Sequence, residues 1–176
     1  MHVTLLAAQS LDGFITQHQF PGSGFTSEAD KSHFRAALSR FDCSIMGGET
    51  FRVSRELILS RLTSQRLRLV LTRDPAAFAK DARPGLLEFT QLGAPEMLAQ
   101  LESRGYQRCA LLGGAQLHSM FLEANLVDEL WLTIEPVLFG QGTPFLSRKG
   151  EFRLSLFEQS HLSEDVLLLK YRTSKN

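Results

Sequence analysis

The chain has 176 residues, of which 43% are hydrophobic and 22% charged, the proportions of one globular domain that can bury a core. Its 19 acidic and 19 basic side chains balance, so charge gives no reason to expect DNA or another polyanion as a partner. No apolar run approaches the roughly 20 residues that cross a bilayer, and MHVTLLAAQS carries no basic leader. We therefore expect a cytoplasmic protein that binds neither nucleic acid nor membrane.

Predicted strands and helices alternate along the chain. The apolar run HVTLLAA is typical of a strand covered on both faces, and apolar residues at 34, 37, 38 and 41 have helical spacing after Ser27. Further strands are predicted at 43–47, 66–72, 86–90, 108–112 and 128–135, with a short helix after 47 and helices at 94–105 and 115–124. The tail FRLSLFEQSHLSEDVLLLKYR predicts an antiparallel edge hairpin with a turn near Ser163. The pattern indicates a single α/β domain over 1–176, with a mostly parallel sheet.

Two pairs of glycines, Gly47-Gly48 and Gly113-Gly114, each lie between a predicted strand and a predicted helix. Glycine weakens both elements, so bare backbone is needed there. A tight turn alone would explain one such pair. Two pairs in equivalent positions favour a dinucleotide held between them, because ligands of parallel sheets lie beyond the carboxyl ends of strands, at helix N-termini. The common nucleotide motifs G-x-G-x-x-G and G-x-x-x-x-G-K-[ST] are absent, so a nucleotide site would be of another kind.

The segments LLAAQSLDGFIT, SIMGGETF, RLVLTR and LLGGAQLHSMFL, followed by LVDELWLTIEPVLFGQGTPF, resemble a known superfamily in order and spacing. They are similar to dihydrofolate reductase and to the C-terminal reductase domain of the bifunctional deaminase/reductase of riboflavin biosynthesis, here in a stand-alone form. The resemblance implies an NADPH-dependent oxidoreductase with a three-layer fold, an antiparallel C-terminal hairpin and a cis peptide between paired glycines. The riboflavin branch generally dimerises, so the resemblance also implies a homodimer.

The resemblance assigns residues to the cofactor. The two turns would hold the phosphates through Gly47, Gly48, Thr50 and Phe51, and through Gly113, Gly114, Ala115, Gln116 and Leu117. Ala8 and Ile15 match the nicotinamide pocket, and Thr72 and Arg73 match the site of the adenosine 2′-phosphate. An arginine there favours NADPH over NADH because a guanidinium binds phosphate through two hydrogen bonds; an ordinary surface arginine is the alternative. Gly48 stands where dihydrofolate reductases usually carry a cation, so one phosphate contact is missing.

Asp30 is the candidate catalytic acid, because it precedes Phe34 by four residues as the acid of the family does. Thr133 matches the threonine that hydrogen-bonds this acid. Reduction of a C=N bond needs a proton on nitrogen, which a buried carboxyl can deliver. However, SEAD (27–30) is also an S-x-x-D helix start, in which Asp30 would only cap the first turn. Thr133 is equally explained as a β-branched strand residue.

The substrate is left open by the sequence. The riboflavin reductases usually carry D-D-P-x-L-T-x-R after the first glycine turn, whereas this chain reads ETFRVSRELILSRLTSQR. Arg66 lies near the position that holds the folate carboxylate in dihydrofolate reductase, although a generic basic residue explains it as well. Three hypotheses remain: a reductase of the riboflavin pyrimidine type or a relative with another heterocyclic substrate, a dihydrofolate reductase, and an NADPH-binding protein without efficient catalysis. We expect no metal, since His33 and His118 have no partners at ligand spacing, and Cys43 and Cys109 are expected as buried thiols.

Overall fold

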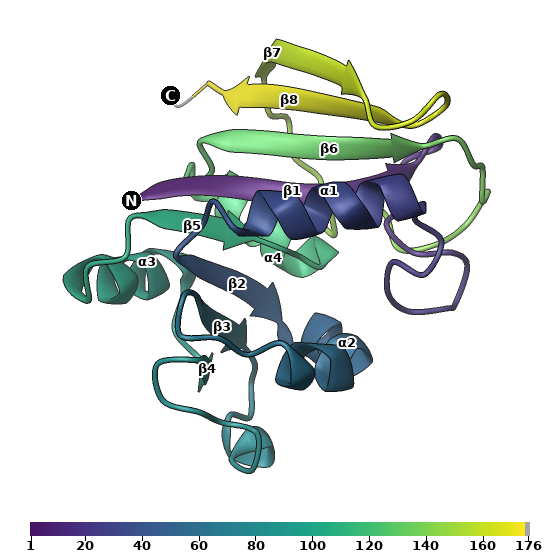
Figure 1. The fold of residues 1–176 in the computed structure, drawn as a ribbon. Helices are drawn as coiled ribbons and strands as arrows, with labels where there is room; N and C mark the ends of the chain where they lie inside the picture. Colours follow the sequence, from purple (N-terminus) through teal and green to yellow (C-terminus); the bar gives the residue numbers. More distant parts are fainter. Residues whose placement is uncertain (175–176) are drawn as a thin grey trace.

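The structure, a computed structural model, describes residues 1–174 and contains one eight-stranded sheet in the order β4-β3-β2-β5-β1-β6-β8-β7 (Figure 1). The strands are β1 (His2–Ser10), β2 (Cys43–Gly47), β3 (Leu67–Leu71), β4 (Leu87–Thr90), β5 (Arg108–Leu111), β6 (Glu129–Glu135), β7 (Leu154–His161) and β8 (Leu167–Thr173). The first six strands pair in parallel, and β8 and β7 add an antiparallel hairpin. This confirms the predicted three-layer α/β fold with a hairpin at one edge.

The helices cover both faces of this sheet. They are α1 (Glu28–Leu38), α2 (Gly48–Ser60), α3 (Ala94–Ser103) and α4 (Ala115–Glu123). Neighbouring side chains of a strand point to opposite faces, so Leu5 packs with α3 and α4 whereas Leu6 packs with α1. Both faces of β1 are therefore buried, as its continuous apolar run predicted.

Helix α2 has thirteen residues and is longer than the short helix expected after residue 47. Only Phe51 of this helix is buried, while Val53 and Leu57 are 44% and 51% exposed. Ile58 and Leu59, at helical spacing from Phe51, are partly buried and pack against the same core cluster, so the apolar stripe is present and the sequence prediction made this helix too short. A 3-10 turn at Ala76–Phe78, which the sequence pattern did not predict, supplies Phe78 to the same small core as Phe51.

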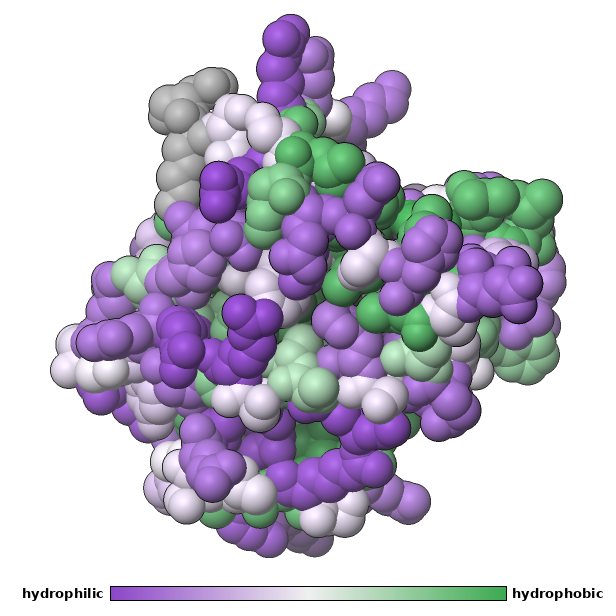
Figure 2. All heavy atoms as spheres, turned by 45° about the horizontal axis from the view of Figure 1, so that its top comes forward, coloured by the Kyte–Doolittle hydropathy of each residue, from purple (hydrophilic) through white to green (hydrophobic). Residues whose placement is uncertain are grey.

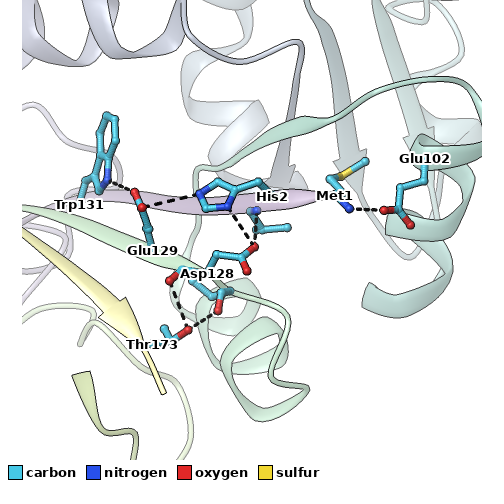
Figure 3. A network of polar contacts seen from close by, with 9 residues as sticks. Met1, His2, Glu102, Asp128, Glu129, Trp131 and Thr173 are labelled. Atoms are coloured by element: carbon cyan, nitrogen blue, oxygen red, sulfur yellow. Dashed lines mark hydrogen bonds and ion pairs between the residues drawn. The ribbon is translucent and has the colours of Figure 1, made fainter. Parts of the chain in front are cut away.

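Polar contacts join the strands at their amino ends, the edge opposite to the glycine turns (Figure 3). Asp128 accepts a hydrogen bond from the backbone N–H of Val3 (2.7 Å), and His2 lies 3.8 Å from Asp128 and 3.9 Å from Glu129. At the same edge Asp42 accepts from the backbone N–H groups of Gln107 and Arg108. These contacts leave the carboxyl ends of the strands as the edge at which a ligand would bind.

The face of the molecule in Figure 2 is mostly hydrophilic, with hydrophobic side chains in separate patches. The outer strand β7 exposes Leu154, Leu156 and Phe157, each at least 37% accessible. Within residues 1–174, no helix is long and apolar enough to cross a membrane.

Candidate active site

The two glycine turns lie side by side at the carboxyl edge of the sheet. The backbone N–H of Gly47 donates to the carbonyl of Gly113 over 2.9 Å, which confirms the expectation that the two turns are close. Gly47 and Gly114 are the N-cap residues of α2 and α4, and neither helix has a side-chain cap. Two helix N-termini, each with backbone N–H groups free of capping side chains, therefore open at one place, the arrangement that binds phosphates. The peptide between Gly113 and Gly114 is cis, as the resemblance implies.

The structure gives different reasons for the glycines of this site. Gly113 has φ +93°, and a Cβ there would lie 2.4 Å from Nε2 of His118, so no other residue fits. A Cβ at Gly47 or Gly114 would meet its nearest protein atom only at 3.7 Å, an ordinary contact. Packing within the protein therefore does not require glycine at these two positions. Bare backbone there suits the close approach of a ligand such as a pyrophosphate.

Three further residues assigned to the cofactor surround these turns. Oγ1 of Thr50 lies 3.7 Å from the position that a Cβ of residue 114 would take. Cβ of Thr72 lies 3.4 Å from the position that a Cβ of residue 48 would take. Arg73 follows Thr72 at the end of β3 and is exposed. Its guanidinium has no hydrogen bond or ion pair to any described residue, so it is available to a phosphate.

The remaining residues of the two turns serve mainly the core. Phe51 is fully buried, with its ring 5.6 Å from that of Phe78 and 5.1 Å from that of Phe89. Ala115 and Leu117 are 6% and 3% exposed, whereas the neighbouring Gln116 is exposed. The side chains of Phe51 and Leu117 therefore anchor the helices that carry the turns.

The predicted nicotinamide side lies where β1 and β6 pair. Ala8 is the register partner of Thr133, and the backbone N–H of Ile15 donates to the carbonyl of Thr143 over 2.8 Å. Thr133 is 2% exposed. The resemblance implies a hydrogen bond between Thr133 and Asp30; in the part of the chain that the structure describes, the Thr133 hydroxyl makes no such bond.

Asp30 is 8% exposed and lies in the first turn of α1. The N-cap of this helix is Ser27, whose Oγ accepts from the backbone N–H of Asp30 over 3.1 Å. The backbone N–H and the hydroxyl of Ser27 both donate to Oε1 of Glu135, each over 2.9 Å. Asp30 thus contributes only its backbone to the cap, and its carboxylate accepts no hydrogen bond from the described residues. A nearly buried carboxylate without a capping partner is available for chemistry at this edge.

Glu135 is a residue of this site that the sequence analysis missed. It ends β6 and is 3% exposed. Its sequence neighbours IEPV match no capping motif, and its partner Ser27 lies 108 residues away. Only the parallel pairing of β1 with β6, which brings Glu135 beside Ser10 at the carboxyl edge, would have indicated this contact.

His118 is almost completely buried behind Gly113, at 1% exposure. Its Nδ1 lies 2.9 Å from the carbonyl of Phe145 and therefore carries the proton of a neutral imidazole. Burial lowers the pKa of His118 to about 4. Its Nε2 has no hydrogen-bond partner within residues 1–174 and faces Gly113. The sequence showed only that His118 has no partner at metal-ligand spacing, because its contact with the turn depends on the fold.

Arg66 does not join this group of residues. It precedes β3, at the end opposite to Thr72, and its Nη1 donates to the carbonyl of Leu38 at the end of α1 over 2.7 Å. Burial lowers the pKa of Arg66, and its Nε is buried without a partner. A contact between Arg66 and a substrate remains a prediction, and such a substrate would have to extend along α1 from Asp30.

Comparisons with known proteins agree with this geometry. Residues 1–168 match the family described as RibD C-terminal domain. The riboflavin biosynthesis protein RibD of Corynebacterium ammoniagenes is 32% identical over 83% of this chain, and this chain spans about half of that protein (46%). A pyrimidine reductase-like protein of Corynebacterium diphtheriae has a similar structure, with TM-score 0.78 and 16% identity over 99% of this chain and 92% of that one.

The dihydrofolate reductase of Enterococcus faecalis, solved in complex with NADP(H), also has a similar structure, with TM-score 0.68 and 18% identity over 98% of this chain and 96% of that one. At these identities the likeness concerns the fold. The family match covers nearly the whole chain and includes both glycine turns and Asp30. The chain therefore belongs to the RibD C-terminal domain family and has the fold of dihydrofolate reductase.

Proposed function

We propose that this chain is an NADPH-dependent reductase that transfers a hydride to a ribosylaminopyrimidine, as a 5-amino-6-(5-phosphoribosylamino)uracil reductase, or to a related heterocycle. The observation that carries the proposal is the hydrogen bond between Gly47 and Gly113, which sets two uncapped helix N-termini beside each other. The relative from Corynebacterium ammoniagenes, a riboflavin biosynthesis protein, supports the pyrimidine class of substrate over dihydrofolate. A homodimer that acts in the cytoplasm is part of the same proposal.

The residues present fit the dinucleotide. Gly47 and Gly114 would let the pyrophosphate approach the two helix N-termini, and the free guanidinium of Arg73 would bind the 2′-phosphate. NADPH supplies the hydride when it is bound. Ala8 and Ile15 would border its nicotinamide, since they flank the carboxyl end of β1.

Asp30 would supply the proton that a C=N bond needs as hydride arrives. The support is its low exposure together with a carboxylate that accepts no cap hydrogen bond. The alternative of a binding protein without catalysis would be supported if Asp30 only capped its helix, whereas the N–H of Ser27 donates to Glu135 and not to the Asp30 carboxylate. Thr133, on the strand beside Ala8, would complete the wall next to the reacting bond.

Two measurements on the purified chain test the proposal. Calorimetry should show NADPH binding, and NADPH oxidation should be followed with the ribosylaminopyrimidine, with dihydrofolate and with a panel of small heterocycles. Turnover of the pyrimidine is the expected result. Turnover of dihydrofolate alone would replace the proposed substrate, and binding without turnover of any compound would favour the cofactor-binding protein.

A further inference from the structure

Glu135 belongs to β6 but completes the cap of α1. Its Oε1 accepts two hydrogen bonds from one residue, the N-cap Ser27, through the backbone N–H and the hydroxyl. At 3% exposure this carboxylate is shielded from water. A buried carboxylate that accepts two donors holds them firmly, because charged acceptors make stronger hydrogen bonds than neutral ones. Glu135 therefore fixes the start of α1 to the carboxyl end of β6.

The backbone N–H of Ser27 could instead donate to a side chain of its own helix. In a capping box, the side chain at the third helical position accepts from the backbone N–H of the N-cap residue. Asp30 occupies that position after Ser27, and Ser27 already accepts from the N–H of Asp30, so one half of the box is formed. The other half is absent because Ser27 N–H points to Glu135. The carboxylate of Asp30 is left unengaged as a result.

We propose that Glu135 is a positioning residue: it takes the hydrogen bond that would otherwise draw Asp30 into a capping box, and so leaves the Asp30 carboxyl group free to take up a proton and donate it to the substrate nitrogen. This inference rests on the proposed function in so far as Asp30 is the acid. The geometric part, competition between two carboxylates for one N–H, is independent of any substrate.

Removal of Glu135 has a defined consequence. In Glu135→Ala the N–H of Ser27 loses its acceptor, and an unsatisfied N–H at a helix start is unfavourable. The Asp30 carboxylate then closes the local capping box. A carboxylate that gains a backbone N–H donor has a lower pKa and is a weaker acid catalyst at neutral pH. The other charged groups around Asp30 are the same in both proteins: His33 and the Lys31–Glu28 pair on α1, and Arg40 and the Lys170–Glu158 pair of the C-terminal hairpin, which act on His33.

The experiment compares Glu135→Ala, Glu135→Gln, Asp30→Asn and the double variant Asp30→Asn/Glu135→Ala. The control is Asp42→Ala, which likewise removes a carboxylate that accepts two hydrogen bonds, here from two backbone N–H groups at the amino edge of the sheet. Turnover is measured as NADPH oxidation with the compound of the panel above that the wild type reduces. The pKa of Asp30 is measured by carbon NMR of its labelled carboxyl group, which needs no substrate.

We expect Glu135→Ala to lower turnover by about 10²-fold, the usual scale for loss of general-acid help. Glu135→Gln, whose amide oxygen can accept both bonds, should recover most of that loss. In the Asp30→Asn background, Glu135→Ala should cause no further loss, because it acts only through Asp30. The pKa of Asp30 should fall in Glu135→Ala and stay unchanged in Asp42→Ala.

The two failures are distinguishable. If Asp30→Asn retains full turnover, the proposed acid is wrong, and the NMR titration still decides whether Glu135 controls Asp30. If the pKa of Asp30 is the same in Glu135→Ala as in the wild type, or if the two variants Glu135→Ala and Asp30→Asn lose turnover additively, Glu135 has only a structural role and the inference is overturned.

Discussion

Substitution by alanine should affect the adjacent residues Gly113 and Gly114 differently: at Gly113 it should lower stability, and at Gly114 it should lower the affinity for NADPH. In Gly113→Ala, an L-residue must adopt φ +93°, which costs about 1–2 kcal/mol. The new Cβ would also lie 2.4 Å from Nε2 of His118. The imidazole must move away and lose its bond to Phe145, worth about 1 kcal/mol. The free energy of unfolding should therefore fall by about 2–3 kcal/mol, which lowers Tm by at least about 4 °C in a chain of this size.

Gly114→Ala meets no protein atom closer than 3.7 Å, so its free energy of unfolding should change by less than about 1 kcal/mol. Its methyl group would instead stand where the pyrophosphate must approach the N-terminus of α4. We expect a loss of NADPH affinity of at least about tenfold, or 1.4 kcal/mol.

Urea unfolding and calorimetric NADPH titration of both variants check this pair. A Gly113→Ala protein as stable as the wild type would refute the argument from φ and His118. A stable Gly114→Ala protein with undiminished NADPH affinity would remove the turn from the cofactor site. A double-mutant cycle with His118→Ala provides an internal control: Gly113→Ala should cost less stability in the His118→Ala background than in the wild type, because only the contact and not the backbone conformation has been relieved there.

Four further predictions concern single groups. Arg73→Ala should weaken binding of NADPH by about 1.5–3 kcal/mol and leave NADH unchanged, since only NADPH carries the 2′-phosphate; equal losses in calorimetry would exclude Arg73 from the site. Asp30→Asn should lower turnover by about 10²–10⁴-fold with unchanged NADPH affinity and little loss of stability, whereas an earlier unfolding transition with normal turnover would identify Asp30 as a cap. The pKa of His118 falls to about 4 on folding, so as the pH is lowered the unfolded chain takes up a proton at this residue before the folded protein does. The free energy of unfolding should therefore decrease as the pH falls from about 6.5 to 4, by up to about 1.4 kcal/mol per pH unit. In His118→Gln the urea midpoint should depend less on pH over that range. Light scattering should show a dimer, through the apolar side chains of β7, and a monomer at micromolar concentration would contradict it.

The fold was predictable because its signals are local. Apolar runs buried on both faces identified the parallel strands, and the four apolar positions after Ser27 identified α1. The glycine pairs indicated that two helix N-termini follow strands at one edge of the sheet, and the hydrogen bond between Gly47 and Gly113 brings these two turns together there. The length of α2 was missed although Phe51, Ile58 and Leu59 have helical spacing and pack in one core cluster, because the exposed Val53 and Leu57 blur that stripe. The sequence likewise could not indicate that the ring of Phe51 lies in an aromatic core with Phe78 and Phe89.

The hydrogen bonding around Asp30 could not be predicted from its neighbours in the sequence. The letters SEAD are the same for a capping aspartate and for a catalytic one, because both need a carboxylate in the first turn of a helix. In the structure the N–H of Ser27 donates to Glu135, which is 108 residues away, and the carboxylate of Asp30 does not complete the cap. The position of Glu135 follows from the register of β1 with β6, which places this residue opposite Ser10 at the edge where α1 begins. A capping motif therefore indicates a structural carboxylate only when no second acceptor reaches the N-cap from elsewhere in the fold, and in this chain one does.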